Sequence, residues 1–248
     1  MSDIDLLENL DIAKVAAKTA GQFLIKQQHS ARRVSQELFH DVKINGDVEA
    51  EQIILEYLRR RSNFAILSEE TASPDKGNQD YRWIVDPIDG TLNYFQKIPF
   101  CCVSIGLWQG QKPILGAVYD FNRDELFSGI ADEKAWLNDV FVKVSKTKTK
   151  EKAVLCTGFP ALTDYSQDAI QNFVKQIQNY RKIRLLGSAA LSIAYVASGK
   201  VDAYCERGIM LWDIAGGIPL LLGAGGKVHM EKATEDNSFN VYISNGYI

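Results

Sequence analysis

The stretch "WIVDPIDGTL" at residues 83–92 constrains the fold and chemistry of this chain more than any other. An aspartate that attacks substrate beside a D-G-T motif would stand two positions before Asp89, but that position holds Pro87, which has no nucleophilic atom. Asp86 stands one residue earlier, at the end of an apolar run that predicts a strand over 82–86. The two carboxylates at this strand end therefore need a role other than covalent catalysis.

Hydrophobic periodicity divides the rest of the chain into two parts. Apolar residues at helical spacing predict helices over 4–24 and 47–61, and shorter runs predict strands over 64–68, 82–86, 101–108, 114–120 and 125–130. Beyond residue 140 we predict strands at 153–157, 182–186, 201–205 and near 228 and 242, and helices at 166–180, 188–198 and 213–223. The pattern indicates a layered α/β (α+β) fold in which residues 1–140 form a helix pair on an antiparallel sheet. Residues 141–248 form a second α/β half, and both halves pack as one compact unit.

Composition and charge argue against several functions. The formal net charge of −3 speaks against binding to a phosphate backbone, and the basic run at 143–152 is interpreted as a solvated loop. The N-terminus lacks the basic start of a signal peptide, and no apolar run reaches the roughly 20 residues that span a bilayer. We expect a soluble, cytoplasmic protein that binds neither nucleic acid nor membrane. The four cysteines have no C-x-x-C spacing, which predicts buried free thiols.

Acidic residues stand where predicted strands end and predicted helices begin: Glu69 and Glu70, Asp86, Asp89, and Asp213. Loops at such element ends converge on one crevice, so carboxylates far apart in sequence are expected to meet there. Taken singly, each has an ordinary explanation, for example as a helix cap. Their conjunction beside Gly90 and Thr91, which can open a helix, indicates oxygen ligands for hard cations.

The residues present do not match other motifs that are built on acids or nucleophiles. A calcium loop starting at Asp86 would need a polar residue, a glycine and a glutamate where Ile88, Thr91 and Lys97 stand. No cysteine is followed by the arginine of a cysteine phosphatase, and no G-x-S-x-G or H-x-x-x-H motif is present. A serine hydrolase or a zinc site is therefore disfavoured.

Four segments together resemble the inositol monophosphatase family. "WIVDPIDGTLNYFQKIPFCCVSIGL" is similar to its first signature and "LWDIAGGIPLLLGAGG" to its second, with "SEE" at 68–70 and "DVKINGD" at 41–47 in the matching order. The resemblance implies an αβαβα sandwich of the inositol monophosphatase and fructose-1,6-bisphosphatase type. It also implies lithium-sensitive, Mg²⁺-dependent hydrolysis of a phosphate monoester by water, with two to three ions in each active site and a homodimeric assembly.

The resemblance assigns the metal ligands one by one. Glu69, Asp86 and the carbonyl of Ile88 would hold the first ion, and Asp86, Asp89 and Asp213 the second, on the leaving-group oxygen. A carboxylate that bridges both ions suits metals about 3.5–4 Å apart, which clamp the attacking and leaving oxygens of an in-line displacement. Glu69 is also expected to assist catalysis at the attacking water.

The remaining assignments concern catalysis and substrate. Thr91 would pair with Asp47 to take a proton from the attacking water, and the N–H groups of Gly90 and Thr91 would meet the phosphate, with Asp89 and Asp213 beside it. The resemblance further gives substrate contacts to Gly187, Ser188 and Ala189, and gives Glu206 the ring hydroxyls of a polyol. Asp47 could also be a helix cap, and Glu206 an exposed acid after the strand 201–205.

One position departs from the family pattern D-x-V-T-x-x-D, because Ile44 stands where threonine is expected. Both aspartates remain, so the departure bears on the positioning of Asp47 and on a third ion. We expect a small phosphorylated polyol, inositol 1-phosphate first, as substrate. Histidinol phosphate, 3′-phosphoadenosine 5′-phosphate, fructose 1,6-bisphosphate and NADP remain alternatives, and so does a non-catalytic binding or regulatory role on the same fold.

Overall fold

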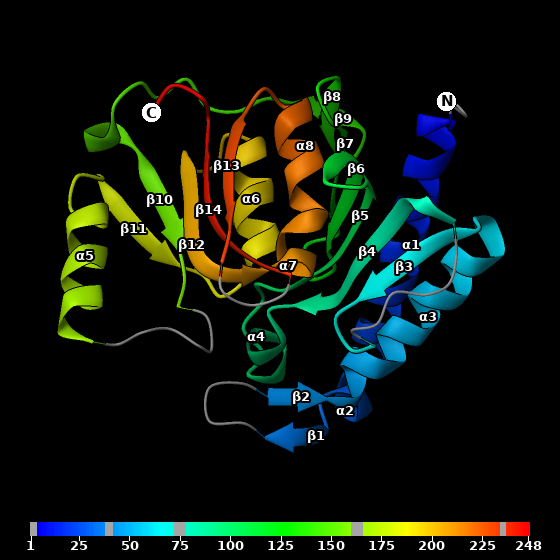
Figure 1. Ribbon diagram of the computed structural model, residues 1–248. Helices are drawn as coiled ribbons and strands as arrows, with labels where there is room; N and C mark the ends of the chain where they lie inside the picture. The colour runs from blue at the N-terminus through cyan, green and yellow to red at the C-terminus, as the bar shows by residue number, and fades with distance from the viewer. Residues whose placement is uncertain (1–3, 38–41, 72–77, 160–165, 234–236) are drawn as a thin grey trace.

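The computed structural model describes residues 4–37, 42–71, 78–159, 166–233 and 237–248. Its elements form five layers (Figure 1). The first is a helix layer of α1 (Leu6–Lys26) and α3 (Asn45–Arg61), with the short α2 (Gln28–Ala31). It covers a seven-stranded sheet of β3 (Phe64–Ser68), β4 (Asn78–Asp89), β5 (Cys102–Gln109), β6 (Lys112–Asp120), β7 (Glu125–Ile130), β8 (Lys134–Leu137) and β9 (Val140–Val142), in that order.

The middle layer contains α6 (Ala189–Ala197), α7 (Leu211–Ala215) and α8 (Gly217–Gly223). Next comes a five-stranded sheet in the order β11 (Lys182–Leu185), β10 (Val154–Thr157), β12 (Ala203–Met210), β14 (Ser238–Ser244) and β13 (Lys227–Lys232). Helix α5 (Gln167–Ile177) lies outside it (Figure 1). A small hairpin of β1 (Val34–Glu37) and β2 (Val42–Ile44), the helix α4 (Thr91–Phe95) and a 3₁₀ turn (Lys150–Lys152) complete the elements. The predicted αβαβα arrangement is confirmed.

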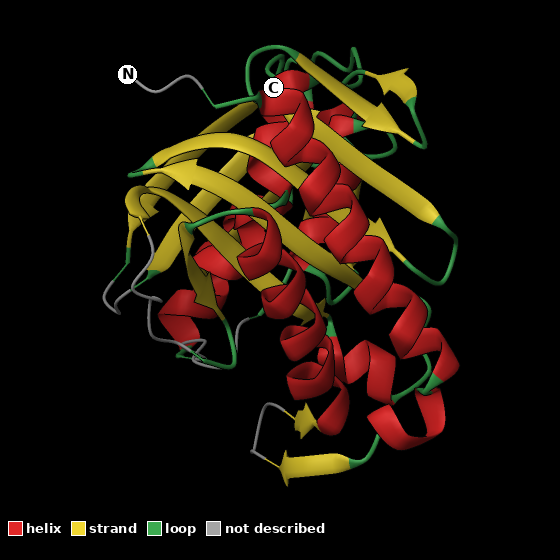
Figure 2. Cartoon of the chain, turned by 90° about the vertical axis from the view of Figure 1, so that its right-hand side faces the viewer, coloured by secondary structure: helices red, strands yellow, loops and turns green. Residues whose placement is uncertain are grey.

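Alternating side-chain directions along the strands of the large sheet explain why helices pack on both of its faces. On β6, Leu115, Ala117 and Tyr119 pack in the same core cluster as α1 and α3. The intervening Val118 packs with α6 and α8. Because successive side chains of a strand point to opposite faces, both faces of the sheet must be apolar. Figure 2 shows the helices of the first layer lying across the strands.

The predicted antiparallel sheet differs from the observed one at its edges. β3 and β4 are parallel, whereas the remaining neighbours are antiparallel. The strands β8 and β9, like β1 and β2, were not predicted from the sequence, since runs of three or four residues are too short to show a clear period.

The middle layer lies very close to the large sheet at two glycines. A Cβ on Gly106 would come within 2.2 Å of the carbonyl oxygen of Ala215, and a Cβ on Gly116 within 2.1 Å of that of Gly216. The indole of Trp108 donates a hydrogen bond to the carbonyl of Ala215 at 3.1 Å. Side chains at 106 and 116 would push α7 and α8 away from the sheet, so these glycines position the helix that carries Asp213. The single helix predicted over 213–223 is in fact two, separated at Gly216.

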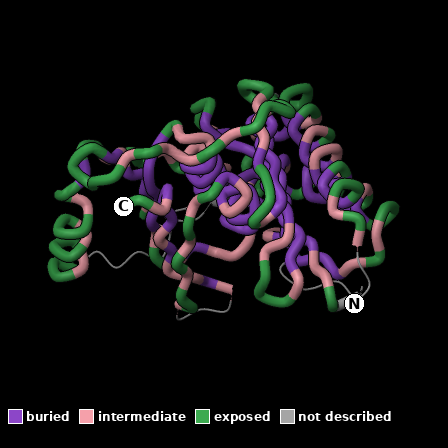
Figure 3. The backbone as a smooth tube through the Cα atoms, turned by 90° about the horizontal axis from the view of Figure 1, so that it is seen from above, coloured by how far each residue is buried: buried purple, intermediate pink, exposed green. Residues whose placement is uncertain are grey.

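The two predicted halves share a core. One cluster of buried residues joins Leu67 and Ile84 of the first half to Leu191, Ile218 and Ile243 of the second. The division at residue 140 therefore stays a prediction about the chain's organisation, while the apolar packing is continuous across it. In Figure 3 the buried backbone follows the sheets and the middle helices, and the outermost helix at the left, α5, has no buried residue.

Among the described residues, no helix combines the length and the apolar character needed to cross a bilayer. All four cysteines are buried and unpaired, as predicted.

Candidate active site

Strand β4 contains one extra residue near its end. Asp86 lies opposite Ser104 of β5 and Asp89 lies opposite Cys102, so three steps along β4 correspond to two along β5. In a regular strand, side chains three apart point to opposite faces, but the bulge directs both aspartates to the face of Ser104 and Cys102. Cys102 packs with the middle helices. The irregularity thus brings two carboxylates of the same strand to one place.

The two residues between the aspartates form the bulge. Pro87 has no N–H to leave unpaired, which makes proline acceptable there. The N–H of Ile88 donates to Asp86 Oδ1 at 2.9 Å, and its carbonyl accepts from the Thr91 hydroxyl at 2.9 Å. A carbonyl oxygen has two lone pairs, so this contact leaves the Ile88 carbonyl able to accept a second partner. As predicted, a helix then begins at Thr91, after Gly90 at φ +92°.

Asp89 is bound by the N-terminus of α6 in the second half of the chain. The backbone N–H groups of Ala189 and Ala190 donate to its carboxylate at 3.1 and 2.7 Å. The Ser188 hydroxyl and the Cys102 thiol also donate to it. A carboxylate at a helix N-terminus is stabilised by the free N–H groups there. Within the segment 187–189, which was predicted to contact substrate, Ser188 and Ala189 therefore hold Asp89 in the structure.

Asp213 and Asp47 occupy the same position in two different helices. Each is the third residue of its helix and accepts a hydrogen bond from the N–H of the residue that precedes the helix, Met210 at 3.0 Å and Ile44 at 2.9 Å. This is the acidic part of a capping box, and neither residue is the N-cap itself. The second oxygen of Asp47 accepts from Thr91 at 3.2 Å, so the predicted Asp47–Thr91 pair is present.

Glu69 joins the aspartates from the end of β3. Its N–H donates to the carbonyl of Val85 at 3.2 Å, which places it next to Asp86, and the two carboxyl groups share a hydrogen bond. Glu70 instead binds Lys43, with 2.9 Å between Nζ and Oε2. Lys43 also interacts electrostatically with Glu69 and Asp47. Sequence reasoning did not identify this lysine, although its place in "DVKINGD" pointed to it.

Burial and mutual repulsion raise the pKa values of these acids. Burial, followed by repulsion from Asp47, raises the pKa of Glu69 to about 8, and burial raises that of Asp47 to about 7. Burial, together with the charges of Glu69, Asp89 and Asp213, raises the pKa of Asp86 well above its usual value. The pKa values of Asp89 and Asp213 are raised by burial as well. Such shifts in a cluster of like charges are typical of functional sites.

The oxygen atoms gathered at this site are chemically suited to a hard cation. Carboxylates and carbonyls suit Mg²⁺, and buried carboxylates require compensating positive charge. The buried hydroxyls of Ser68, adjacent to Glu69, and of Ser104, opposite Asp86, have no hydrogen-bond partner among the described residues. The thiol of Cys102 has a pKa well above its usual value because it is buried, so it is no competing soft ligand.

The side chains are nevertheless not in ligand geometry. Within the described parts of the chain, no three acidic, histidine or cysteine side chains form a group arranged to hold an ion. Asp86 is paired with Glu69 and Asp89 is turned to α6, so their carboxyl groups would have to rotate for an ion to bind. The assignment of each residue to an ion therefore stays a prediction.

The predicted polyol ligand Glu206 lies inside a strand. β12 runs to Met210, and Glu206 pairs in register with Val241 of β14, so it is not an exposed residue after a strand end. Tyr204 donates its hydroxyl proton to Glu206 at 2.8 Å. Burial raises the pKa of Glu206 to about 7, and the charge of Asp89 adds to this effect. Glu206 thus lies within electrostatic range of Asp89 in the acid cluster.

Gly187 and Gly90 lie against each other where the two halves meet. A Cβ on Gly90 would come within 2.9 Å of the Gly187 carbonyl oxygen, and both residues have positive φ. The amide of Asn93 donates to the carbonyls of Leu186 and Phe100 at 2.7 and 2.8 Å. Sequence reasoning missed Asn93, which ties α4 to the strand leading into α6. Asp41 of the motif at 41–47 lies outside the described residues.

Comparisons with known proteins identify the family and the fold. The family model described as "Inositol monophosphatase family" matches residues 5–243. The Nus factor SuhB of Pasteurella multocida is 32% identical over 246 residues, which cover 96% of this chain and 89% of that protein.

Solved structures show the same fold. An inositol monophosphatase from Anabaena superposes with a TM-score of 0.84 at 35% identity and covers 98% of this chain and 93% of its own. A staphylococcal IMPase-II solved with inositol monophosphate bound has a TM-score of 0.79 at 25% identity, with 96% and 89% covered. The chain thus belongs to the inositol monophosphatase family, as its two signatures indicated.

Proposed function

We propose that this protein hydrolyses a small phosphate monoester with Mg²⁺ as its cofactor. The observation that carries the proposal is the convergence of Glu69, Asp86, Asp89 and Asp213 on one buried site from three separate elements, the end of β3, the strand β4 and the helix α7. Membership of a monophosphatase family supports the phosphatase activity. It also supports the cofactor, because the family is in general Mg²⁺-dependent. In the reaction, water adds its oxygen to phosphorus, the bond between phosphorus and the alcohol oxygen breaks, and the alcohol leaves with a proton.

Residues of this chain would hold two metal ions and accept the proton of the attacking water. Glu69, Asp86 and the Ile88 carbonyl would hold one ion, and Asp86, Asp89 and Asp213 the other. When bound, the ions would lower the pKa of the attacking water and neutralise the leaving oxygen. The Thr91 hydroxyl, hydrogen-bonded to Asp47, can accept a proton from that water and pass its own to the carboxylate.

The capacity of Asp47 to accept a proton fits this role. Its pKa of about 7, raised by burial, lies near neutral pH, where a general base is most effective. The N–H groups of Gly90 and Thr91 lie at the start of α4 and would bind phosphate oxygens.

For the alcohol, we propose inositol 1-phosphate as the first substrate to test. Glu206 supports this choice, because its carboxylate lies beside the acid cluster and can accept hydrogen bonds from hydroxyl groups. The staphylococcal relative binds inositol monophosphate. Histidinol phosphate, 3′-phosphoadenosine 5′-phosphate, fructose 1,6-bisphosphate and NADP belong in the same assay.

The test is steady-state hydrolysis of this panel with Mg²⁺, with excess EDTA, and with millimolar Li⁺. We expect phosphate release that requires Mg²⁺ and is inhibited by Li⁺, the latter being a family trait. Full activity in EDTA would refute the metal-assisted mechanism.

A regulatory role is the second candidate, because the curated relatives are named Nus factor SuhB. If regulation were the only role, the metal-binding acids would be free to change. The chain keeps all of them, including Asp47. Absence of Mg²⁺-dependent hydrolysis across the panel would favour this candidate.

A further inference from the structure

A cavity of about 720 Å³ lies between helix α5 and the strands β12, β13 and β14. It reaches the proposed active site at Glu206, which is one of its lining residues. Gly158, at the end of β10, keeps this junction open, because a Cβ there would come within 2.4 Å of Glu206 Oε2. The volume falls in the range of about 300–1,000 Å³ that is usual for pockets holding drug-sized molecules.

One wall of this α5 cavity is apolar and incompletely covered. Helix α5 has no buried residue, although its apolar residues Ile170 and Phe173 lie on one side of the helix and line the cavity. The rings of Phe159 and Phe173 are in tilted contact, with their centroids 4.7 Å apart and an interplanar angle of 49°. The side chains of Phe159 and Ile170 are 44% and 45% exposed. An amphipathic helix normally buries such a face, so this one has room to cover a planar apolar group.

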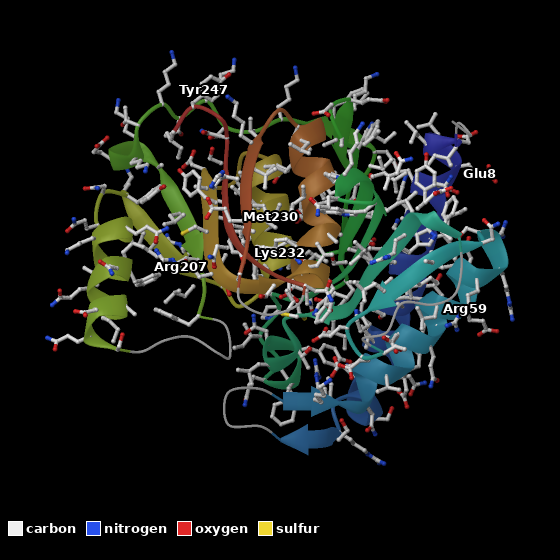
Figure 4. All side chains as sticks on the ribbon, in the orientation of Figure 1. Glu8, Arg59, Arg207, Met230, Lys232 and Tyr247 are labelled. Atoms are coloured by element: carbon white, nitrogen blue, oxygen red, sulfur yellow. The ribbon has the colours of Figure 1, made fainter. Side chains whose placement is uncertain are left out.

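The opposite wall carries two basic side chains beside the acids Glu206 and Glu231. Arg207 on β12 and Lys232 on β13 line the cavity, and neither side chain forms an ion pair with another described residue. Figure 4 labels both, at about mid-height in the view. A third basic side chain, His229, is already paired with Glu231 at 3.0 Å. An anionic group on a ligand would therefore find, beyond the apolar wall, two cations that have no ion-pair partner in the described part of the chain.

We propose that the α5 cavity binds the alcohol part of the substrate, and that this alcohol carries a planar apolar group and, farther out, an anionic group. Glu206 would receive the hydroxyls nearest the phosphate, Phe159 and Phe173 the planar group, and Arg207 with Lys232 the anion. The proposal rests on the phosphatase function proposed above. It goes further because it predicts a preference for esters larger than a simple polyol.

Three synthetic esters test this with one leaving chemistry: propyl phosphate, 3-phenylpropyl phosphate and 3-(4-carboxyphenyl)propyl phosphate. All three release a primary alcohol, so they differ in binding alone. We expect kcat/KM to rise about tenfold or more from the first to the second, the usual effect of burying an aromatic ring. A further several-fold rise is expected for the carboxylated ester. Equal kcat/KM for all three would overturn the proposal.

Variants show whether any preference arises in this cavity. Phe173→Ala should reduce the ratio of kcat/KM for the phenyl ester over the propyl ester by about fivefold or more. The double variant Arg207→Gln with Lys232→Gln should abolish only the gain from the carboxylate. Phe141→Ala removes an exposed aromatic ring from β9, far along the other sheet, and should leave both ratios unchanged. A preference that survives in the Phe173 and Arg207/Lys232 variants would place the alcohol elsewhere and refute the assignment.

Calorimetry separates failure of this proposal from failure of the phosphatase function. The free alcohol 3-(4-carboxyphenyl)propanol should bind the metal-free protein, and Phe173→Ala should weaken that binding about fivefold or more. If no ester is hydrolysed but the alcohol binds in this way, the cavity assignment stands and the phosphatase function falls. If the esters are hydrolysed without preference and the alcohol does not bind, the cavity assignment alone is refuted.

Discussion

The acid cluster at the end of β4 and the α5 cavity lie on either side of Glu206, and they are built in opposite ways. The cluster is buried, and hydrogen bonds from backbone N–H groups hold Asp47, Asp86, Asp89 and Asp213 in place. The α5 cavity is open and lined by partly exposed side chains. The chemistry common to phosphate esters requires fixed charges, because charges that need not reorganise stabilise a transition state best. Recognition of the alcohol can be left to side chains that differ from one protein to the next.

The largest expected effect comes from removing charge in the cluster. Asp86→Asn and Asp213→Asn should each lower kcat by about 10² or more, because each weakens the electrostatic stabilisation of the transition state. Both variants should fold, since loss of one carboxylate relieves repulsion among buried acids. Turnover with subsaturating Mg²⁺ is the measurement, and Glu133→Gln, at an exposed acid after β7, is the control. Near wild-type turnover in either variant would disprove the ligand assignment.

Glu206 tests the border between the two regions. Glu206→Ala should lower kcat/KM for inositol 1-phosphate by about 1–3 kcal/mol, or roughly 5- to 150-fold, the range for a hydrogen bond to a charged group. The loss for p-nitrophenyl phosphate, which has no ring hydroxyls, should be much smaller. An equal loss on both substrates would assign Glu206 to the support of the metal site rather than to the alcohol.

Stability of the metal-free protein should fall as pH rises. The native pKa values of Glu69, Asp47 and Glu206 are about 8, 7 and 7, raised by burial above their unfolded values. Each group therefore contributes its full stability only below its unfolded pKa, where it is protonated in both the native and the unfolded chain. That contribution is lost as the pH rises through the native pKa. Between about pH 5 and 7 the unfolded chain binds fewer protons. The free energy of unfolding should therefore decrease by up to about 1.4 kcal/mol per pH unit for each group.

Urea denaturation in EDTA at pH 5, 6, 7 and 8 measures this slope. Glu206→Gln should reduce it by one group's share, which separates the cavity's contribution from that of the cluster. Added Mg²⁺ should restore stability at high pH by binding the ionised carboxylates. A stability that is independent of pH in EDTA would show that the acids are solvated in the native state.

The smallest expected effect concerns Lys43. This lysine brings positive charge to the edge of the cluster, through Glu70 and near Glu69 and Asp47. The charge of Lys43 repels a nearby cation. Lys43→Met should therefore lower the half-saturating Mg²⁺ concentration about two- to fivefold, the size of a partly exposed charge interaction. Lys14→Met, which removes an exposed pair with Asp139, is the control. A higher requirement for Mg²⁺ in Lys43→Met would instead mean that Lys43 orients a ligand.

The letters alone determined the layered fold, most of its elements and the identity of the acids. The signatures around Asp86 and Asp213 are local, and the period of apolar residues along α1, α3 and the strands of the large sheet follows from which faces must be buried. Short elements such as β8 and the break at Gly216 lacked a period and were missed.

Tertiary structure alone decided how these residues are used. The bulge at Pro87 and Ile88 depends on pairing with β5, and the attachment of Asp89 to the N-terminus of α6 joins residues about 100 positions apart. The sequence predicted Glu206 after the end of a strand, but in the structure it pairs with β14 and lines the cavity. The α5 cavity had no signature in the sequence, since a space is made by the distance between elements, and the local periodicity that predicts each element does not encode that distance.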